Sequence, residues 1–188
     1  MIVFSKFLLF FVFLFFSVNS LFAEDSNIIS KPLSNYINKI NKPFKFQDFS
    51  YLLSRCSGFF FGASNAFHQI SADKKNNIKE RNKILFGPKQ GKSVEFKKIG
   101  DLFFNVLLEL NLKEKKISIS NNKEIKLLTK KIELEINKFN LEYSFLMLDN
   151  AKLNYDPTKN NQFLSDDAFI CTGLLSQIEN THNNKLVK

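Results

Sequence analysis

The chain has 188 residues, and its 27 lysines and arginines outnumber its 18 aspartates and glutamates, for a formal net charge of +9. This length suits one ordinary domain that does not need a disulfide to fold. Only Arg55 and Arg81 are arginines, and this scarcity argues against nucleic-acid binding, because such sites favour the bidentate guanidinium group.

Residues 1–23 have the features of a secretion signal. Lys6 supplies a short basic region, residues 7–18 are apolar with one exception, and a processing site could lie after Ala23. This apolar core suits a signal peptide and is short for a membrane span. We therefore expect a periplasmic or secreted protein, and the alternative is a membrane anchor formed by residues 7–23.

Hydrophobic spacing predicts one short helix and four long ones after the signal. Residues 24–45 form an arm whose short helix lies between Pro32 and Pro43. Steps of three and four between apolar residues predict the four long helices. Their apolar positions are Phe49, Leu52, Cys56, Phe59, Ala63, Ala66 and Ile70; Ile99, Phe103, Val106 and Leu110; Ile125, Leu128, Ile132, Ile136, Phe139, Tyr143 and Leu146; and Leu164, Ala168, Cys171, Leu175 and Ile178.

These patterns predict an all-α fold, an antiparallel bundle of about four helices with a short extra N-terminal helix. Residues 46–180 would form the bundle and residues 181–188 a flexible tail. We expect Ser93 and Ser165 to cap two of the helices, with Asp166 and Asp167 in the first turn of the last one.

The two cysteines of the chain, Cys56 and Cys171, each fall on the apolar seam of a different predicted helix. An oxidising compartment favours their pairing, so we expect one disulfide between the first long helix and the last. The alternative is two buried free thiols.

Small and polar residues run beside the seam of the first long helix. Glycine inside a helix costs up to about 1 kcal/mol relative to alanine, so something should offset Gly58 and Gly62. One interpretation is the close approach of a neighbouring helix. The other is a groove for a ligand or partner helix, which would be formed by Ser54, Arg55, Gly58, Gly62, Asn65 and His68.

Residues 74–98 contain nine basic and two acidic residues, a net charge of 9 − 2 = +7. This stretch is either a solvated connector or a contact for an anionic partner such as an envelope surface. The basic residues of the possible contact are Lys74, Lys75, Lys79, Arg81, Lys83, Lys89 and Lys92.

Motifs for catalysis or cofactor binding are weak in this chain. The segment from Gly87 to Ser93 has the wrong glycine spacing for a phosphate loop, and Ser71-x-x-Lys74 lacks the companion motifs of penicillin-binding enzymes. His68 and His182 have no metal-ligand spacing. We predict no catalytic residue, no metal and no cofactor.

The sequence thus favours a small secreted binding or envelope-associated protein that does not catalyse a reaction. Its partner would be an unidentified protein or an anionic envelope surface. Two alternatives are an inhibitor or immunity-type binder of a partner enzyme, and a hydrolase with an unrecognised site.

Overall fold

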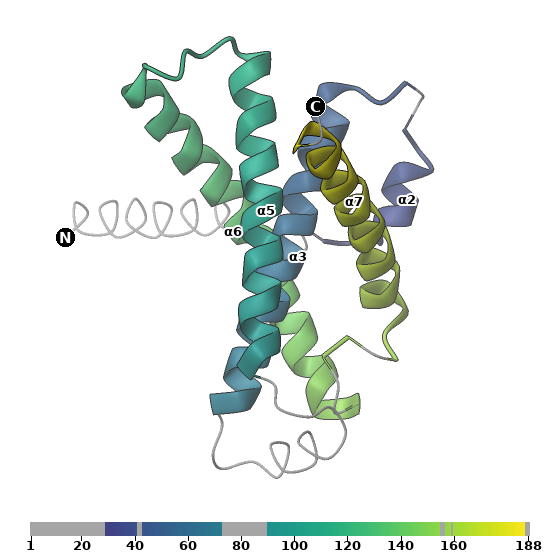
Figure 1. The fold of residues 1–188 in the computed structure, drawn as a ribbon. Helices are drawn as coiled ribbons and strands as arrows, with labels where there is room; N and C mark the ends of the chain where they lie inside the picture. The colour runs from purple at the N-terminus through teal and green to yellow at the C-terminus, as the bar shows by residue number, and fades with distance from the viewer. Residues whose placement is uncertain (1–28, 41–42, 73–89, 155–156, 159, 187–188) are drawn as a thin grey trace, which may run out of the picture.

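The computed structural model describes residues 29–40, 43–72, 90–154, 157–158 and 160–186. These residues form one short helix, α2 (Leu33–Ile37), and four long ones: α3 (Phe46–Ala72), α5 (Gln90–Glu114), α6 (Asn122–Asn154) and α7 (Gln162–Leu186). Figure 1 shows their arrangement. The predicted all-α bundle is confirmed. The expected signal peptide and most of the basic connector lie outside the described residues.

Helix α3 is the centre of the bundle and packs extensively against both α5 and α6. Every residue from Leu52 to Phe60 is buried, as expected for a helix that has neighbours on all sides. The predicted seam supplies much of this core, including Leu52, Phe59 and Ala63. On α5 and α6 the core residues include Phe103 and Ile136.

The glycines of α3 lie where α6 approaches its backbone. A Cβ atom added to Gly58 would overlap the Cβ of Phe139, and one added to Gly62 would lie 2.6 Å from the Cβ of Tyr143. Asn65, on the same face, donates a hydrogen bond of 2.9 Å to the side chain of Asn140. The close helix approach expected from the small residues is therefore present, and α6 fills the space of the alternative groove.

Helix α7 is joined to α3 by the predicted disulfide. Cys56 and Cys171 are both fully buried, and their Cα atoms are 5.3 Å apart. The short helix α2 packs against α7, as Figure 1 shows on the right of the molecule. α7 continues to Leu186, beyond the position where the sequence suggested a flexible tail.

Two predicted helix caps are wrong, because both helices begin earlier than expected. α7 starts at Gln162, and Asn161 caps it by accepting a hydrogen bond of 3.1 Å from the backbone N–H of Leu164. α5 starts at Gln90, so Ser93 lies inside the helix and donates its hydroxyl hydrogen to the carbonyl oxygen of Ser64, 3.0 Å away.

No helix of the described residues is long and apolar enough to cross a membrane. Residues 1–23, on which the signal and anchor interpretations depend, are not among them.

Candidate functional site

The buried polar residues form a network that joins four segments of the chain. Arg55 of α3 contacts Asp167 of α7 through an ion pair of 2.7 Å, and it also donates to the carbonyl oxygen of Lys31 at 2.7 Å. Its Nε donates to the hydroxyl of Tyr143 at 2.7 Å, and Nη1 donates to Tyr51 at 3.0 Å.

Both carboxylate oxygens of Asp167 accept hydrogen bonds, just as the guanidinium group of Arg55 donates them. One carboxylate oxygen accepts from the backbone N–H of Leu33 at 2.6 Å, and the other accepts from Arg55 and from the hydroxyl of Tyr143. Burial raises the pKa of Tyr143 well above its ordinary value, and the nearby Asp167 charge raises it further. Burial alone would lower the pKa of Arg55, but the proximity of Tyr143 and Asp167 outweighs it and raises that pKa.

This network is structural. Both charged groups are fully buried and hydrogen-bonded, and their partners come from the protein itself, so neither is available to a ligand. Sequence reasoning placed Arg55 beside a groove and Asp167 in the first turn of the last helix. Arg55 is instead buried, and Asp167 lies beyond the first turn of α7, which begins at Gln162. The sequence did contain a signal that both residues are buried. Arg55 adjoins the seam residue Cys56, and Asp167 lies three residues after Leu164 and four before Cys171, on the same face of the helix.

The other residues of the predicted groove do not meet around a cavity. Ser54 is fully buried, and its hydroxyl has no hydrogen-bond partner among the residues that the structure describes. Gly58, Gly62 and Asn65 face α6, while His68 is exposed near the end of α3.

Of the predicted basic contact, only Lys92 lies within the described residues. It is exposed, and its Nζ atom lies 6.0 Å from the centre of the Phe67 ring. The remaining predicted members, from Lys74 to Lys89, lie outside the described residues, so the connector stays a prediction.

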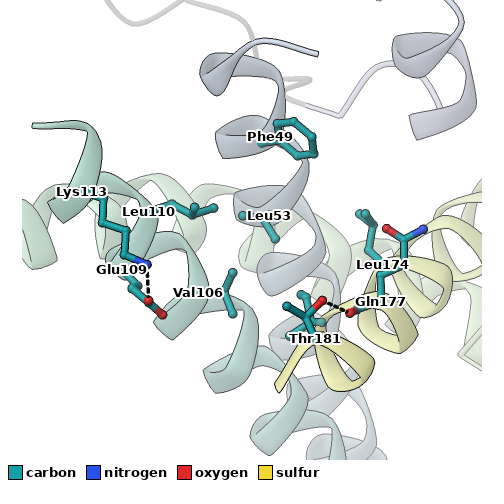
Figure 2. A pocket seen from close by; sticks show the side chains of 10 residues that line it. Phe49, Leu53, Val106, Glu109, Leu110, Lys113, Leu174, Gln177 and Thr181 are labelled. Atoms are coloured by element: carbon teal, nitrogen blue, oxygen red, sulfur yellow. Dashed lines mark hydrogen bonds and ion pairs between the residues drawn. The ribbon is translucent and has the colours of Figure 1, made fainter. Parts of the chain in front are cut away.

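Two apolar grooves flank α7 and are the best candidate site in the described part of the chain. The larger, of about 660 Å³, lies between α3, α7 and the end of α2 with the segment that follows it. Its walls include Ile37, Phe44 and Ile170. The smaller, of about 290 Å³, lies between α3, α5 and α7. In Figure 2, Val106 and Leu110 of α5 and Leu174 of α7 line this smaller groove.

Phe49, Leu174 and Gln177 line both grooves, so the two grooves adjoin at these residues. Phe49 was expected in the core seam, but 44% of it is exposed at this junction. Phe169, on the wall of the larger groove, is 81% exposed. Sequence reasoning missed this site.

The chemistry of the lining suits binding. Its only charged side chains are Glu109 and Lys113, which form an ion pair of 2.6 Å on the rim of the smaller groove (Figure 2). The hydroxyls of Thr172 and Thr181 donate to backbone carbonyls one turn earlier in α7. The residues that line the larger groove, where Ser176 also lies, include no His, Asp, Glu or Lys, so the lining offers no activated nucleophile beside a base. Across the described residues, no cluster of His, Cys, Asp or Glu could hold a metal ion.

One glycine distinguishes the larger groove. Gly58, Gly62 and Gly100 each lie against a neighbouring helix, so an added Cβ would meet protein atoms within about 3 Å. Gly173 lines the larger groove, and an added Cβ there would meet no described atom within 4 Å. Nothing in the described part of the molecule thus offsets the helix-destabilising effect of this glycine.

Comparisons with protein-family models, with curated proteins and with solved structures found no match for this chain.

Proposed function

We propose that the protein is a non-catalytic binding protein that acts outside the cytoplasm and holds an apolar partner in the grooves beside α7. The partner of this proposal is the apolar face of a helix from another protein. A structural disulfide supports an oxidising compartment, since such bonds are rare in the cytosol.

The observation that carries the proposal is the apolar region formed by two adjoining grooves that share Phe49 and Leu174. Its volume lies in the range of ligand sites, and its lining has few polar groups. An amphipathic helix suits an apolar groove, because side chains spaced by three and four residues would enter it in a row. Gly173 would let the backbone of such a helix come close to α7.

Gly173 provides two tests, one of stability with Gly173→Ala and one of binding with Gly173→Leu. Gly173→Ala should raise the free energy of unfolding by up to about 1 kcal/mol, because alanine favours the helix and the added methyl group meets open space. Gly58→Ala, the matched control, should lower it, since the new Cβ would overlap Phe139. Urea titrations followed by circular dichroism measure both changes.

Binding is measured with Nile red, an uncharged apolar dye whose emission rises in an apolar site. Gly173→Leu places a bulky side chain in the larger groove and should weaken dye binding about tenfold, a loss of about 1.4 kcal/mol. Leu134→Gln, an exposed change on α6, should leave dye binding unchanged. Equal dye binding by the original protein and by Gly173→Leu would contradict the groove as the site.

A further inference from the structure

The outer face of α6 carries a second exposed feature that has no part in the grooves. At successive steps of three or four residues this face presents lysine and apolar side chains that alternate as far as Leu141. We call this set the α6 stripe, and it consists of Lys123, Leu127, Lys130, Leu134, Lys138, Leu141 and Phe145. All seven are exposed, and none lines either groove.

The stripe is distinct from the face of α6 that holds the helix in the bundle. The buried residues of α6 include Leu128, Ile132, Ile136 and Tyr143, which occupy the opposite side of the helix from Leu134. The four apolar stripe residues are between 57% and 67% exposed, although each is large enough to bury substantial area. An apolar row that the bundle leaves uncovered points to an external surface.

The charge of the stripe restricts what that surface can be. Its charged members are all lysines, while the acidic residues of α6, such as Glu124, Glu133 and Glu142, lie off the stripe. A second copy of the chain is a poor occupant, because pairing two stripes would place lysines against lysines. An occupant must instead offer negative charge and apolar depth along about 33 Å of helix.

We propose that the α6 stripe lies on an anionic phospholipid surface. Such a surface presents phosphate groups above acyl chains, so lysine ammonium groups can stay at headgroup level while Leu134, Leu141 and Phe145 enter the layer below. Lysine followed by an apolar residue, repeated along one exposed face, matches this two-layer arrangement. The contact is peripheral, and it places the groove-bearing protein at a membrane surface.

The test is co-sedimentation with vesicles of phosphatidylcholine, with and without phosphatidylglycerol. The protein should bind the anionic vesicles and not the neutral ones, and binding should fall as salt rises, because the Debye length shortens from about 30 Å at 0.01 M to about 8 Å at 0.15 M. Lys130→Gln with Lys138→Gln should weaken binding about tenfold or more. Leu134→Gln with Leu141→Gln should weaken it by a similar factor, since apolar insertion is lost.

Two exposed lysines outside α6 provide a control with the same loss of charge. Lys98→Gln with Lys115→Gln should change vesicle binding by less than about twofold. All of these positions are exposed, so the melting temperature should be unchanged. Equal losses from the stripe pair and the control pair would show that general charge attraction, and not the stripe, governs binding, and would overturn the proposal.

A spectroscopic signal locates the contact directly. The chain has no tryptophan, so Phe145→Trp introduces a single indole on the stripe. Its emission should shift to the blue with anionic vesicles, whereas that of Phe169→Trp, on α7, should not. No shift at position 145, or no binding to anionic vesicles, would overturn the proposal and favour an acidic protein partner. Gly173→Leu should bind vesicles normally, so this inference and the groove proposal can fail separately.

Discussion

Tyr143 is a residue whose protonation and packing are linked. Its ring is fully buried and lies edge-on to Phe59, with 5.1 Å between ring centres, and its hydroxyl donates to Asp167 while accepting from Arg55. Burial, followed by the Asp167 charge, raises its pKa. The folded protein therefore holds this proton more tightly than the unfolded chain, in which tyrosine titrates near pH 10.

The sign of this shift predicts alkaline destabilisation. The stabilising contribution of the Tyr143 proton is complete below about pH 10 and is lost as the pH rises through the higher folded pKa. The slope from this one group should approach about 1.4 kcal/mol per pH unit. Urea unfolding between about pH 8 and pH 11 measures it.

Two variants separate Tyr143 from the other titrating groups. Tyr143→Phe should be less stable at neutral pH, because Arg55 loses an acceptor, but its stability should decline less steeply above about pH 10. Burial and the hydrogen bond to Asp48 raise the pKa of Tyr36 to about 12, so Tyr36→Phe is the comparison. Parallel alkaline profiles for the original protein and Tyr143→Phe would contradict the assignment.

Between elements, the ion pair of Arg55 and Asp167 fastens α7 to α3, with α2 attached to the same carboxylate through Leu33. Asp167→Ala should lower the free energy of unfolding by about 3–5 kcal/mol, because it leaves the Arg55 charge buried and unpaired. Chemical unfolding in urea measures the loss.

The neighbouring carboxylate is the matched control for this prediction. Asp166 is half-buried and accepts one hydrogen bond of 3.1 Å from the backbone N–H of Ser34, so Asp166→Ala should cost only about 1 kcal/mol. Adding Arg55→Met to Asp167→Ala should recover part of the loss, because the uncompensated charge is removed. Equal losses for Asp166→Ala and Asp167→Ala would contradict a dominant buried pair.

The elements that sequence reasoning found are those defined by local periodicity. Four long helices and the Cys56–Cys171 pairing follow from the spacing of apolar side chains, because that spacing records which face a helix buries. The ends of helices were less predictable. Ser93 and Ser165 are good capping residues by type, but both helices begin three residues before them. Tertiary contacts hold these turns in place, since Ser93 donates to Ser64 of α3 and Asp166, next to Ser165, accepts from Ser34.

The candidate site depends on contacts that local pattern does not record. Phe49 fits the α3 seam by spacing, yet it is half-exposed because none of the described helices covers the end of that seam beside α7. Ile117 and Ile119 stand two residues apart in the same polar connector, yet Ile119 is 84% exposed and Ile117 packs on the core. Sequence reasoning also missed the α6 stripe. The apolar residues on the opposite, buried face of α6 are more numerous, and their spacing was the one that predicted the helix.

At the scale of the whole molecule, α7 is fastened to α3 in its N-terminal half and borders the grooves along much of its length, from Phe169 to Thr181. Its N-terminal half carries Asp167 and Cys171, whereas Gln177 and Ile178, further along, line groove walls. The disulfide closes a separation of 115 residues. In the chain-entropy account, a bridge of that span stabilises the fold by about 4–5 kcal/mol relative to the reduced chain.

Breaking the disulfide should therefore affect stability and the grooves but spare the outer face of α6. Cys56→Ala with Cys171→Ala should lower the free energy of unfolding by about 4–5 kcal/mol while the helical circular dichroism signal persists under native conditions. Nile red binding should weaken, because the wall formed by α7 is less firmly held, and binding to anionic vesicles should not change. A variant as stable as the original protein, or one that loses vesicle binding and keeps dye binding, would show that the bridge does not hold the groove together.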